Sequence, residues 1–282
     1  MNKYTVGKAT KGLCEYLKNE FAGEKSVVIA YDSRNNSKAF AECAAEVLCY
    51  NGIKTFLFEE IMPTPVLSFS VKYLNCNAGI VITASHNPKD YNGYKVYDKY
   101  GCQLVPQYAD KVISYINNVK DIKSVKHMNL NMALSNGYLT YIGDEVLNSY
   151  ISEVEKMAVY KEASDLKIVY TPLHGTGNIP VRKVLSGMSF DVSVVKEQAV
   201  ADGNFTTVRS PNPEEKDALN MALEQAKRAN ADLVIGTDPD CDRVGVGVLH
   251  NREYTLLTGN QTGALLVDFY LKHRYSFALL PL

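Results

Sequence analysis

Residues 78–83 read AGIVIT, a short apolar run that is rich in β-branched residues. Such a run predicts a strand that is buried on both faces of a sheet. Two more strands are expected before it, at residues 26–31 (SVVIAY) and 55–58, with helices between the three strands at residues 40–48 and 66–74. This β-α-β-α-β order favours an α/β domain with helices packed on a sheet.

The alternation starts again after a polar stretch at residues 107–136. Strands are expected at residues 166–170, 190–195, 233–236 and 244–248, and helices at 144–157 and 179–185 and from Asn212 onward. The predicted fold class is therefore α/β, with two successive similar domains of mixed sheets flanked by helices, plus the start of a third. The expected limits are 1–137 for the first domain, 138–250 for the second and 251–282 for the third.

The last of these segments contains a strand-like run at 254–257 and a helix-like run at 262–271. One helix does not bury its apolar face alone, and the apolar ending SFALLPL at 276–282 has no obvious partner within the sequence. We therefore expect a truncated chain.

Composition restricts the function classes. The chain has 282 residues and a formal net charge of −1, so it lacks the basic excess typical of nucleic-acid binding. Its six cysteines form no CxxC pair, which is typical of a reducing compartment and of buried, inert thiols. The N-terminus lacks a signal-peptide core, and the apolar stretch at 264–271 is too short to span a bilayer. These features predict a cytoplasmic protein without a membrane or nucleic-acid partner.

Residues 83–95 read TASHNPKDYNGYK and directly follow the predicted strand AGIVIT. Because ligands gather at the carboxyl ends of strands in open α/β sheets, Ser85 is expected at a binding site. Its hydroxyl is a candidate nucleophile or phosphate carrier, and His86 and Asn87 flank it. Lys95 supplies a positive charge that can interact with a phosphate, and its ammonium group can donate a proton. By residue types alone, a polar surface turn with an ordinary serine remains the alternative.

Residues 236–243 read GTDPDCDR, in which Asp238, Asp240 and Asp242 alternate. Alternation in an extended segment places three carboxylates on one side, and such hard oxygen ligands suit Mg²⁺. Arg243 follows at once and is a candidate phosphate ligand.

Two alternatives compete with a magnesium site. A calcium-binding EF-hand loop needs glycine at its sixth position and glutamate at its twelfth, where this chain has Arg243 and Leu249, so this reading fails. A solvated acidic turn is disfavoured because three carboxylates after a buried strand repel one another in the absence of a cation.

Two lesser features remain open. The segment HGTG at 174–177 is either a plain strand-to-helix turn, which is the expected reading, or a loop near a phosphate. Arg34 follows a predicted strand, and its expected role is a surface salt bridge, with reach toward a cleft as the alternative.

The two motifs TASHNPKDYNGYK and GTDPDCDR, in this order, resemble those of the α-D-phosphohexomutases, which include phosphoglucomutases and phosphomannomutases. The resemblance extends to about residue 272. The stretches NPKDYNGYKVY and LLTGNQTGALL are most similar to the bacterial phosphoglucomutase/phosphopentomutase-like branch.

The resemblance implies a role for each motif residue. Ser85 would be the phosphoserine, and Asp238, Asp240 and Asp242 would bind Mg²⁺ together with an oxygen of the serine phosphate. Lys95 would sit at the position of the general acid/base.

Further residues would complete that site. Arg243 would contact the serine phosphate, and His86 and Asn87 would line the site. The family interconverts hexose 1-phosphate and hexose 6-phosphate through a bisphosphorylated sugar, so glucose 1,6-bisphosphate or an equivalent is the expected activator and a phosphorylated sugar the expected partner.

The chain also departs from the family pattern. An arginine-containing segment that precedes the NKYTV-like stretch in the family is absent before Met1. The sugar-selecting loop of the third domain and the phosphate-binding fourth domain are absent too. The chain alone is therefore expected to have little mutase activity. A Mg²⁺-dependent sugar-phosphate phosphatase and a non-catalytic phosphosugar-binding remnant are the alternatives.

Overall fold

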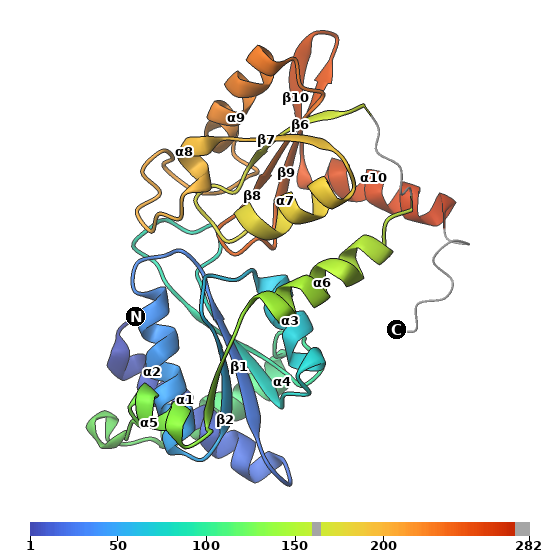
Figure 1. The fold of residues 1–282 in the computed structure, drawn as a ribbon. Coiled ribbons are helices and arrows are strands. Elements are labelled where there is room, and N and C mark those ends of the chain that lie inside the picture. Colours follow the sequence, from blue (N-terminus) through green and yellow to red (C-terminus); the bar gives the residue numbers. More distant parts are fainter. Residues whose placement is uncertain (160–164, 274–282) are drawn as a thin grey trace. The chain divides into compact units, whose positions relative to one another are not determined.

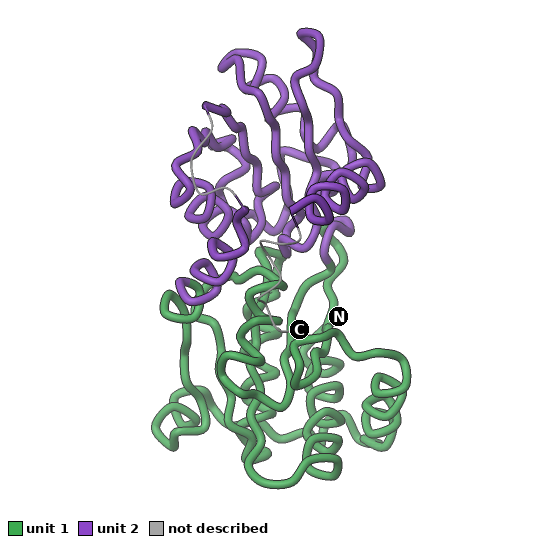
Figure 2. Tube along the Cα trace, turned by 90° about the vertical axis from the view of Figure 1, so that its right-hand side faces the viewer, with its two compact units in different colours: residues 1–84, 89–147 green, residues 85–88, 148–282 purple. Residues whose placement is uncertain are grey.

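The computed structural model describes residues 1–159 and 165–273, so the apolar ending at 276–282 lies outside the described residues. The chain divides into two compact units (Figure 2). The first comprises Met1–Ala84 and Lys89–Leu147, and the second comprises Ser85–Pro88 and the described part of Asn148–Leu282. Four residues of the segment between β3 and β4 therefore group with the second unit.

The first unit contains a five-stranded mixed sheet in the order β4-β3-β1-β2-β5, of which β1 and β2 are labelled in Figure 1. Strands β1, β2, β3 and β5 run parallel, and β4 pairs antiparallel with β3. The strands are β1 (Ser26–Tyr31), β2 (Lys54–Phe58), β3 (Ala78–Ile82), β4 (Tyr94–Tyr97) and β5 (Leu139–Ile142). The helices are α1 (Lys3–Glu20), α2 (Ser37–Tyr50), α3 (Thr64–Tyr73), α4 (Pro106–Asn118) and α5 (Leu130–Ser135), with a 3₁₀ turn η1 at Ile122–Ser124.

Helices cover both faces of this sheet. Ile80 of β3 belongs to the buried cluster that α1 and α2 build with the sheet. Its neighbour Gly79 points to the opposite face, where a Cβ atom would lie 2.7 Å from Val71 and 3.1 Å from Leu67 of α3. Because successive strand residues face opposite sides, α3 covers the face opposite α1 and α2.

The second unit repeats this architecture with a five-stranded mixed sheet in the order β10-β9-β8-β6-β7. Strand β6 runs parallel to β7 and β8, whereas β9 runs antiparallel to both β8 and β10. The strands are β6 (Lys167–Thr171), β7 (Asp191–Val194), β8 (Leu233–Thr237), β9 (Val244–His250) and β10 (Glu253–Leu257). The helices are α6 (Asp144–Lys156), which spans the change of unit, α7 (Asn178–Gly187), α8 (Lys196–Ala199), α9 (Lys216–Ala229) and α10 (Gly259–Lys272).

The core of the second unit forms between α9 and the sheet. Leu219, Ala222 and Leu223 of α9 are buried in one cluster with Val169 of β6 and Val234 of β8. Helix α10, in contrast, has no buried residue among those described, and its leucines and valine are largely exposed.

The α/β class with two similar mixed-sheet units is confirmed, but some sequence predictions fail locally. The helix expected from Asn212 begins at Lys216 instead, because the Asn212 side chain accepts the N–H of Glu214 in a separate turn. Helix α1 was missed, although Asn2 and Thr5 form a capping box at its start.

The expected domain limits remain predictions, and the structure adds two observations to them. Strand β5 pairs with β2, so the first unit continues past residue 137 as far as Leu147. Strand β10 pairs with β9, so the segment after residue 251 adds a strand to the edge of the second sheet.

Two other observations concern the surface. Among the described residues, no helix combines the length and apolar character that a bilayer span requires. Four of the six cysteines are buried as expected, but Cys102 is exposed and Cys241 partly so.

Two glycines of α1 provide a matched test of the first unit's packing. A Cβ atom at Gly12 would lie 2.6 Å from Cα and 2.7 Å from N of Ile116 in α4, whereas one at Gly7 would make only ordinary contacts of 3.6 Å or more. We expect Gly12→Ala to lower the free energy of unfolding by about 1–3 kcal/mol through overpacking. Gly7→Ala should raise it by a few tenths to about 1 kcal/mol through helix propensity. Urea unfolding followed by circular dichroism measures both, and equal effects would contradict the close helix contact.

Candidate active site and metal centre

The serine loop starts where β3 ends. Ser85 lies three residues after Ile82, the last residue of β3, in a left-handed backbone conformation with a φ of 53°. Non-glycine residues adopt this conformation uncommonly, and residues with such strained backbone cluster at functional sites as well as in tight turns. The Ser85 hydroxyl lies 3.3 Å from Nδ1 of His86.

The aspartate loop starts in the same way, where β8 ends at Thr237. The chain then turns, with the N–H of Cys241 donating to the carbonyl of Asp238 over 2.9 Å and Cys241 at a φ of 56°. The expectation of an extended segment is therefore wrong. A turn, rather than strand alternation, gathers the three aspartates.

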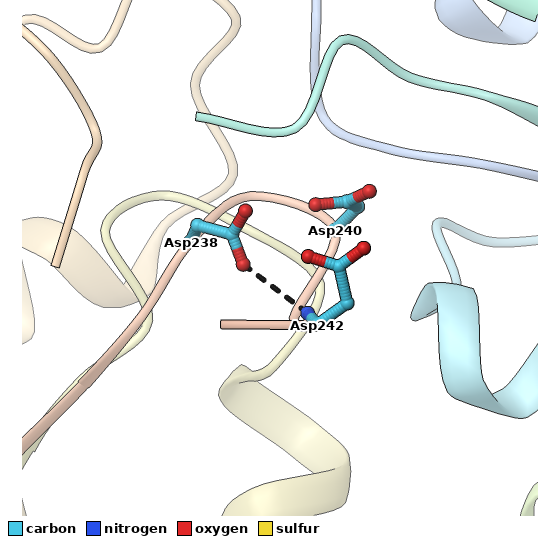
Figure 3. Close-up of side chains that lie close together, drawn as sticks. All are labelled: Asp238, Asp240 and Asp242. Carbon is cyan, nitrogen blue, oxygen red and sulfur yellow. Dashed lines mark hydrogen bonds between the residues drawn. The ribbon is translucent and has the colours of Figure 1, made fainter. Parts of the chain in front are cut away.

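The three carboxylates form one cluster (Figure 3). Asp238, Asp240 and Asp242 each offer one oxygen, and these oxygens all lie within 4.8 Å of one another. Asp238 and Asp240 are 0% exposed, whereas Asp242 is exposed. Within the described residues, this is the one group of three or more acidic, histidine or cysteine side chains with metal-binding spacing.

Asp238 connects the aspartate loop to the serine loop. Its Oδ1 accepts the backbone N–H of Asp242 over 3.1 Å and that of Arg243 over 3.0 Å. Its Oδ2 accepts the Ser85 hydroxyl over 2.7 Å. Both Ser85 and Asp238 belong to the second unit, so this unit itself contains the serine hydroxyl and the acidic cluster.

The electrostatics of the cluster favour a cation. Burial, followed by the charge of Asp240, raises the pKa of Asp238 from 3.8 to about 8. Burial, followed by the charge of Arg243, lowers the pKa of His86, so the imidazole beside Ser85 tends to be neutral. Because ionising both buried aspartates without a counter-charge is costly, the residues fit a divalent cation with oxygen ligands.

The segment HGTG at 174–177 packs against the aspartate loop and hydrogen-bonds to it. A Cβ atom at Gly175 would contact the backbone of Pro239, and one at Gly177 would lie 2.7 Å from Oγ1 of Thr237. Thr176 donates both its N–H and its hydroxyl to the Pro239 carbonyl, each over 2.9 Å. The expected plain turn thus packs closely against the aspartate loop, and glycine is needed at position 175, where the two backbones meet.

His174 anchors this support. It is 2% exposed and lies 2.9 Å from the carbonyl of Val200 through Nδ1 and 2.7 Å from the Thr207 hydroxyl through Nε2. These supporting contacts were not predicted from the sequence. The two glycines of HGTG, two residues apart, were the signal that another backbone approaches closely.

The remaining predicted site residues have varied surroundings. Asn87 is exposed in the serine loop, and Lys95 lies on β4 opposite Val81 of β3. Arg243 is exposed, with Nη1 3.6 Å from a carboxylate oxygen of Glu214.

The expectation of a surface salt bridge for Arg34 is wrong. Arg34 is 3% exposed, and its Nε lies 3.2 Å from Oδ2 of Asp32, which is 1% exposed. Both residues lie in the loop after the central strand β1 and contact the segment between β3 and β4, Asp32 through Thr83 and Arg34 through Tyr91.

The raised pKa of Asp238 predicts how stability depends on pH. Without a divalent cation, the free energy of unfolding should fall as the pH rises from about 4 to about 8, because only the folded state retains the Asp238 proton in this range. Mg²⁺ should oppose this fall by binding the ionised carboxylates. Urea unfolding across this range, with and without Mg²⁺, measures both effects.

Asp238→Asn should reduce the fall and remove the Mg²⁺ effect, and Asp191→Asn, an exposed position on β7 of the same unit, should change neither. If Asp238→Asn keeps the wild-type pH dependence and response to Mg²⁺, this account of the cluster is wrong.

Comparison with known proteins identifies the family of both units. Residues 1–123 match the family description "Phosphoglucomutase/phosphomannomutase, alpha/beta/alpha domain I", and residues 148–251 match "Phosphoglucomutase/phosphomannomutase, alpha/beta/alpha domain II".

Individual relatives give the same result. The phosphoglucomutase of Staphylococcus haemolyticus is 41% identical over 275 residues, which cover 97% of this chain and 50% of the relative. That of Staphylococcus saprophyticus is 39% identical over 269 residues, covering 95% and 49%. The chain thus spans about half the length of the curated relatives it matches.

The fold has solved counterparts. The crystal structure of a phosphoglucomutase/phosphomannomutase family protein from Burkholderia thailandensis superposes with a TM-score of 0.77 at 19% identity, covering 97% of this chain and 56% of the other. Together with the two matched domains, these similarities show that the chain belongs to the phosphoglucomutase/phosphomannomutase family.

Proposed function

We propose that this chain carries the phosphoserine and metal site of a phosphosugar mutase, an enzyme that interconverts hexose 1-phosphate and hexose 6-phosphate. The observation that carries the proposal is the 2.7 Å hydrogen bond from the Ser85 hydroxyl to Asp238, a member of the acidic cluster. A serine held against candidate metal ligands is suited to phosphoryl transfer, which depends mainly on positioning and charge neutralisation.

In this proposal, Ser85 accepts a phosphoryl group from the bisphosphorylated sugar and returns it to a sugar hydroxyl. Its Oγ forms the new P–O bond while the bond between phosphorus and the sugar oxygen breaks. The Ser85 hydroxyl loses its proton, for which Oδ2 of Asp238 is the acceptor in hydrogen-bonding distance, and the departing sugar oxygen would take up a proton from Lys95. Asp238, Asp240 and Asp242 would hold Mg²⁺. When bound, Mg²⁺ supplies positive charge beside the phosphoryl oxygens.

The other predicted residues complete the proposed site. Arg243 lies one residue after the cluster. Its ion pair with Glu214 is exposed and therefore weak, so its guanidinium can turn from Glu214 to a phosphate. His86 adjoins the Ser85 hydroxyl, and Asn87 offers an amide in the same loop. Lys95 is the proposed general acid/base that moves a proton at the sugar hydroxyl.

The names of the relatives support a proposal for the sugar phosphate. Since the curated relatives are called phosphoglucomutase, glucose phosphate is the proposed substrate and glucose 1,6-bisphosphate the proposed activator. A cytoplasmic location suits such a substrate.

The test is the intact mass of the purified 282-residue chain before and after incubation with glucose 1,6-bisphosphate and Mg²⁺. We expect a gain of one phosphoryl group that Ser85→Ala abolishes. Asp238→Asn should slow the gain by about a hundredfold or more, the scale for losing one charge-stabilising group at a reacting centre.

Phosphorus NMR of the same mixtures with glucose 1-phosphate separates the candidate functions. Glucose 6-phosphate identifies a mutase, whereas inorganic phosphate without isomer identifies a phosphatase. Ligand-induced stabilisation without a mass gain at Ser85 would contradict the proposal and favour a binding protein. We expect phosphorylation of Ser85 with slow or no formation of glucose 6-phosphate. Rapid formation of glucose 6-phosphate by this chain would contradict this expectation.

A further inference from the structure

We infer that Asp32 and Arg34 are positioning residues for the serine loop, because they fasten both of its ends to the loop after β1. This inference rests on the proposed role of Ser85. We define the loop clasp as Asp32, Arg34 and Ser37 together with their partners Thr83, Tyr91 and Asn92.

The clasp holds the entry of the serine loop through Thr83, two residues before Ser85. The Thr83 hydroxyl donates to Oδ2 of Asp32 over 2.7 Å, and both side chains are buried. The backbone N–H of Asp32 donates to the Ile82 carbonyl over 3.1 Å. Side-chain and backbone bonds therefore fix the direction in which the chain leaves β3.

The clasp holds the exit of the loop through Arg34 and Ser37. Nη1 of Arg34 donates to the Tyr91 carbonyl over 3.0 Å. The amide of Asn92 donates to the Ser37 hydroxyl over 2.9 Å, and Ser37 in turn donates to Oδ1 of Asp32 over 2.7 Å. One buried carboxylate thus connects both ends of the loop.

The two ends also meet directly. The N–H of Thr83 donates to the carbonyl of Gly93 over 3.1 Å, and a Cβ atom at Gly93 would lie 2.6 Å from the Thr83 carbonyl oxygen. Glycine at this position permits the close approach, so the two ends of the serine loop are held next to each other.

Because its ion pair is buried, the clasp costs much free energy to break. The Asp32 and Arg34 side chains are 0% exposed and form an ion pair of 3.2 Å. Breaking a buried ion pair is far more costly than breaking one at the surface. A serine at a φ of 53° needs surroundings that hold it there, and the clasp supplies fixed ends for that segment.

The clasp also explains the buried Arg34 in functional terms. The guanidinium compensates Asp32 and bonds to the loop exit. Burial raises the pKa of Asp32, whereas its hydrogen bonds from Ser37 and Thr83 and the charge of Arg34 lower it. The contacts that oppose the rise in the pKa of Asp32 are thus the contacts that hold the loop.

The test uses Thr83→Val, which keeps the shape of the side chain and removes its hydroxyl. Thr83→Ser restores a hydroxyl, and Thr55→Val is the matched control because Thr55 is also buried in the first unit but donates to the Ile53 carbonyl near the start of β2. Hydrogen exchange of residues 84–93 is measured first, without any ligand.

We expect Thr83→Val to accelerate exchange in residues 84–93 by about tenfold or more, the equivalent of one lost buried hydrogen bond. Thr55→Val and Thr83→Ser should leave that segment near wild type. If Thr83→Val does not fold, Asn92→Ala tests the exit side in the same way, since Asn92 is only partly buried. Equal exchange in Thr83→Val and Thr55→Val would overturn the inference.

The second measurement is the rate of Ser85 phosphorylation as a function of glucose 1,6-bisphosphate concentration, with Mg²⁺. Thr83→Val should lower the saturating rate by about tenfold or more with little change in the half-saturating concentration, and Thr83→Ser should recover the rate. A changed half-saturating concentration at an unchanged saturating rate would contradict a positioning role. A wild-type chain that gains no phosphate would count against the proposed function, and the exchange result would still decide the clasp.

Discussion

Two buried carboxylates, Asp238 and Asp240, lie side by side at the end of β8, and this arrangement constrains the rest of the site. Ionised together in a buried place, they repel each other unless a cation or a proton intervenes. The loop tolerates them because Asp238 accepts two backbone N–H groups and the hydroxyl of Ser85. The same bonds that stabilise the aspartate therefore bring the serine to the cluster.

Each unit contains the same structural feature, a loop after a parallel strand that is held in shape by hydrogen bonds from a neighbouring loop. In the second unit, HGTG holds the carbonyl of Pro239 and so sets the turn that gathers the carboxylates. In the first unit, Asp32 holds Thr83 at the entry of the serine loop. Left-handed backbone at Ser85 and Cys241 costs free energy, which these supports offset. Rigid positioning of this kind is what phosphoryl transfer requires from a protein.

The sequence predicted the α/β class and the two motif loops, because buried strands and punctuated loops leave strong local patterns. It did not predict how the aspartates come together. Aspartates at every second position are compatible both with an extended strand and with a turn at Pro239 and Asp240. It also misplaced Arg34 at the surface, because the burial of Arg34 depends on a distant part of the chain, the segment at Tyr91, whose carbonyl it contacts. The residue types thus predicted the local strands and loops. They did not predict which residues are buried or which distant loops hydrogen-bond to them.

The central claim is that the three aspartates form a cation site shared with Ser85. Anomalous X-ray diffraction from crystals of the chain soaked in Mn²⁺, a substitute for Mg²⁺, tests it most directly. The account predicts an anomalous peak bounded by carboxylate oxygens of Asp238, Asp240 and Asp242, with the Ser85 oxygen beside it. Crystals that retain the observed loop arrangement but show Mn²⁺ only elsewhere, or not at all at saturating concentration, would contradict it.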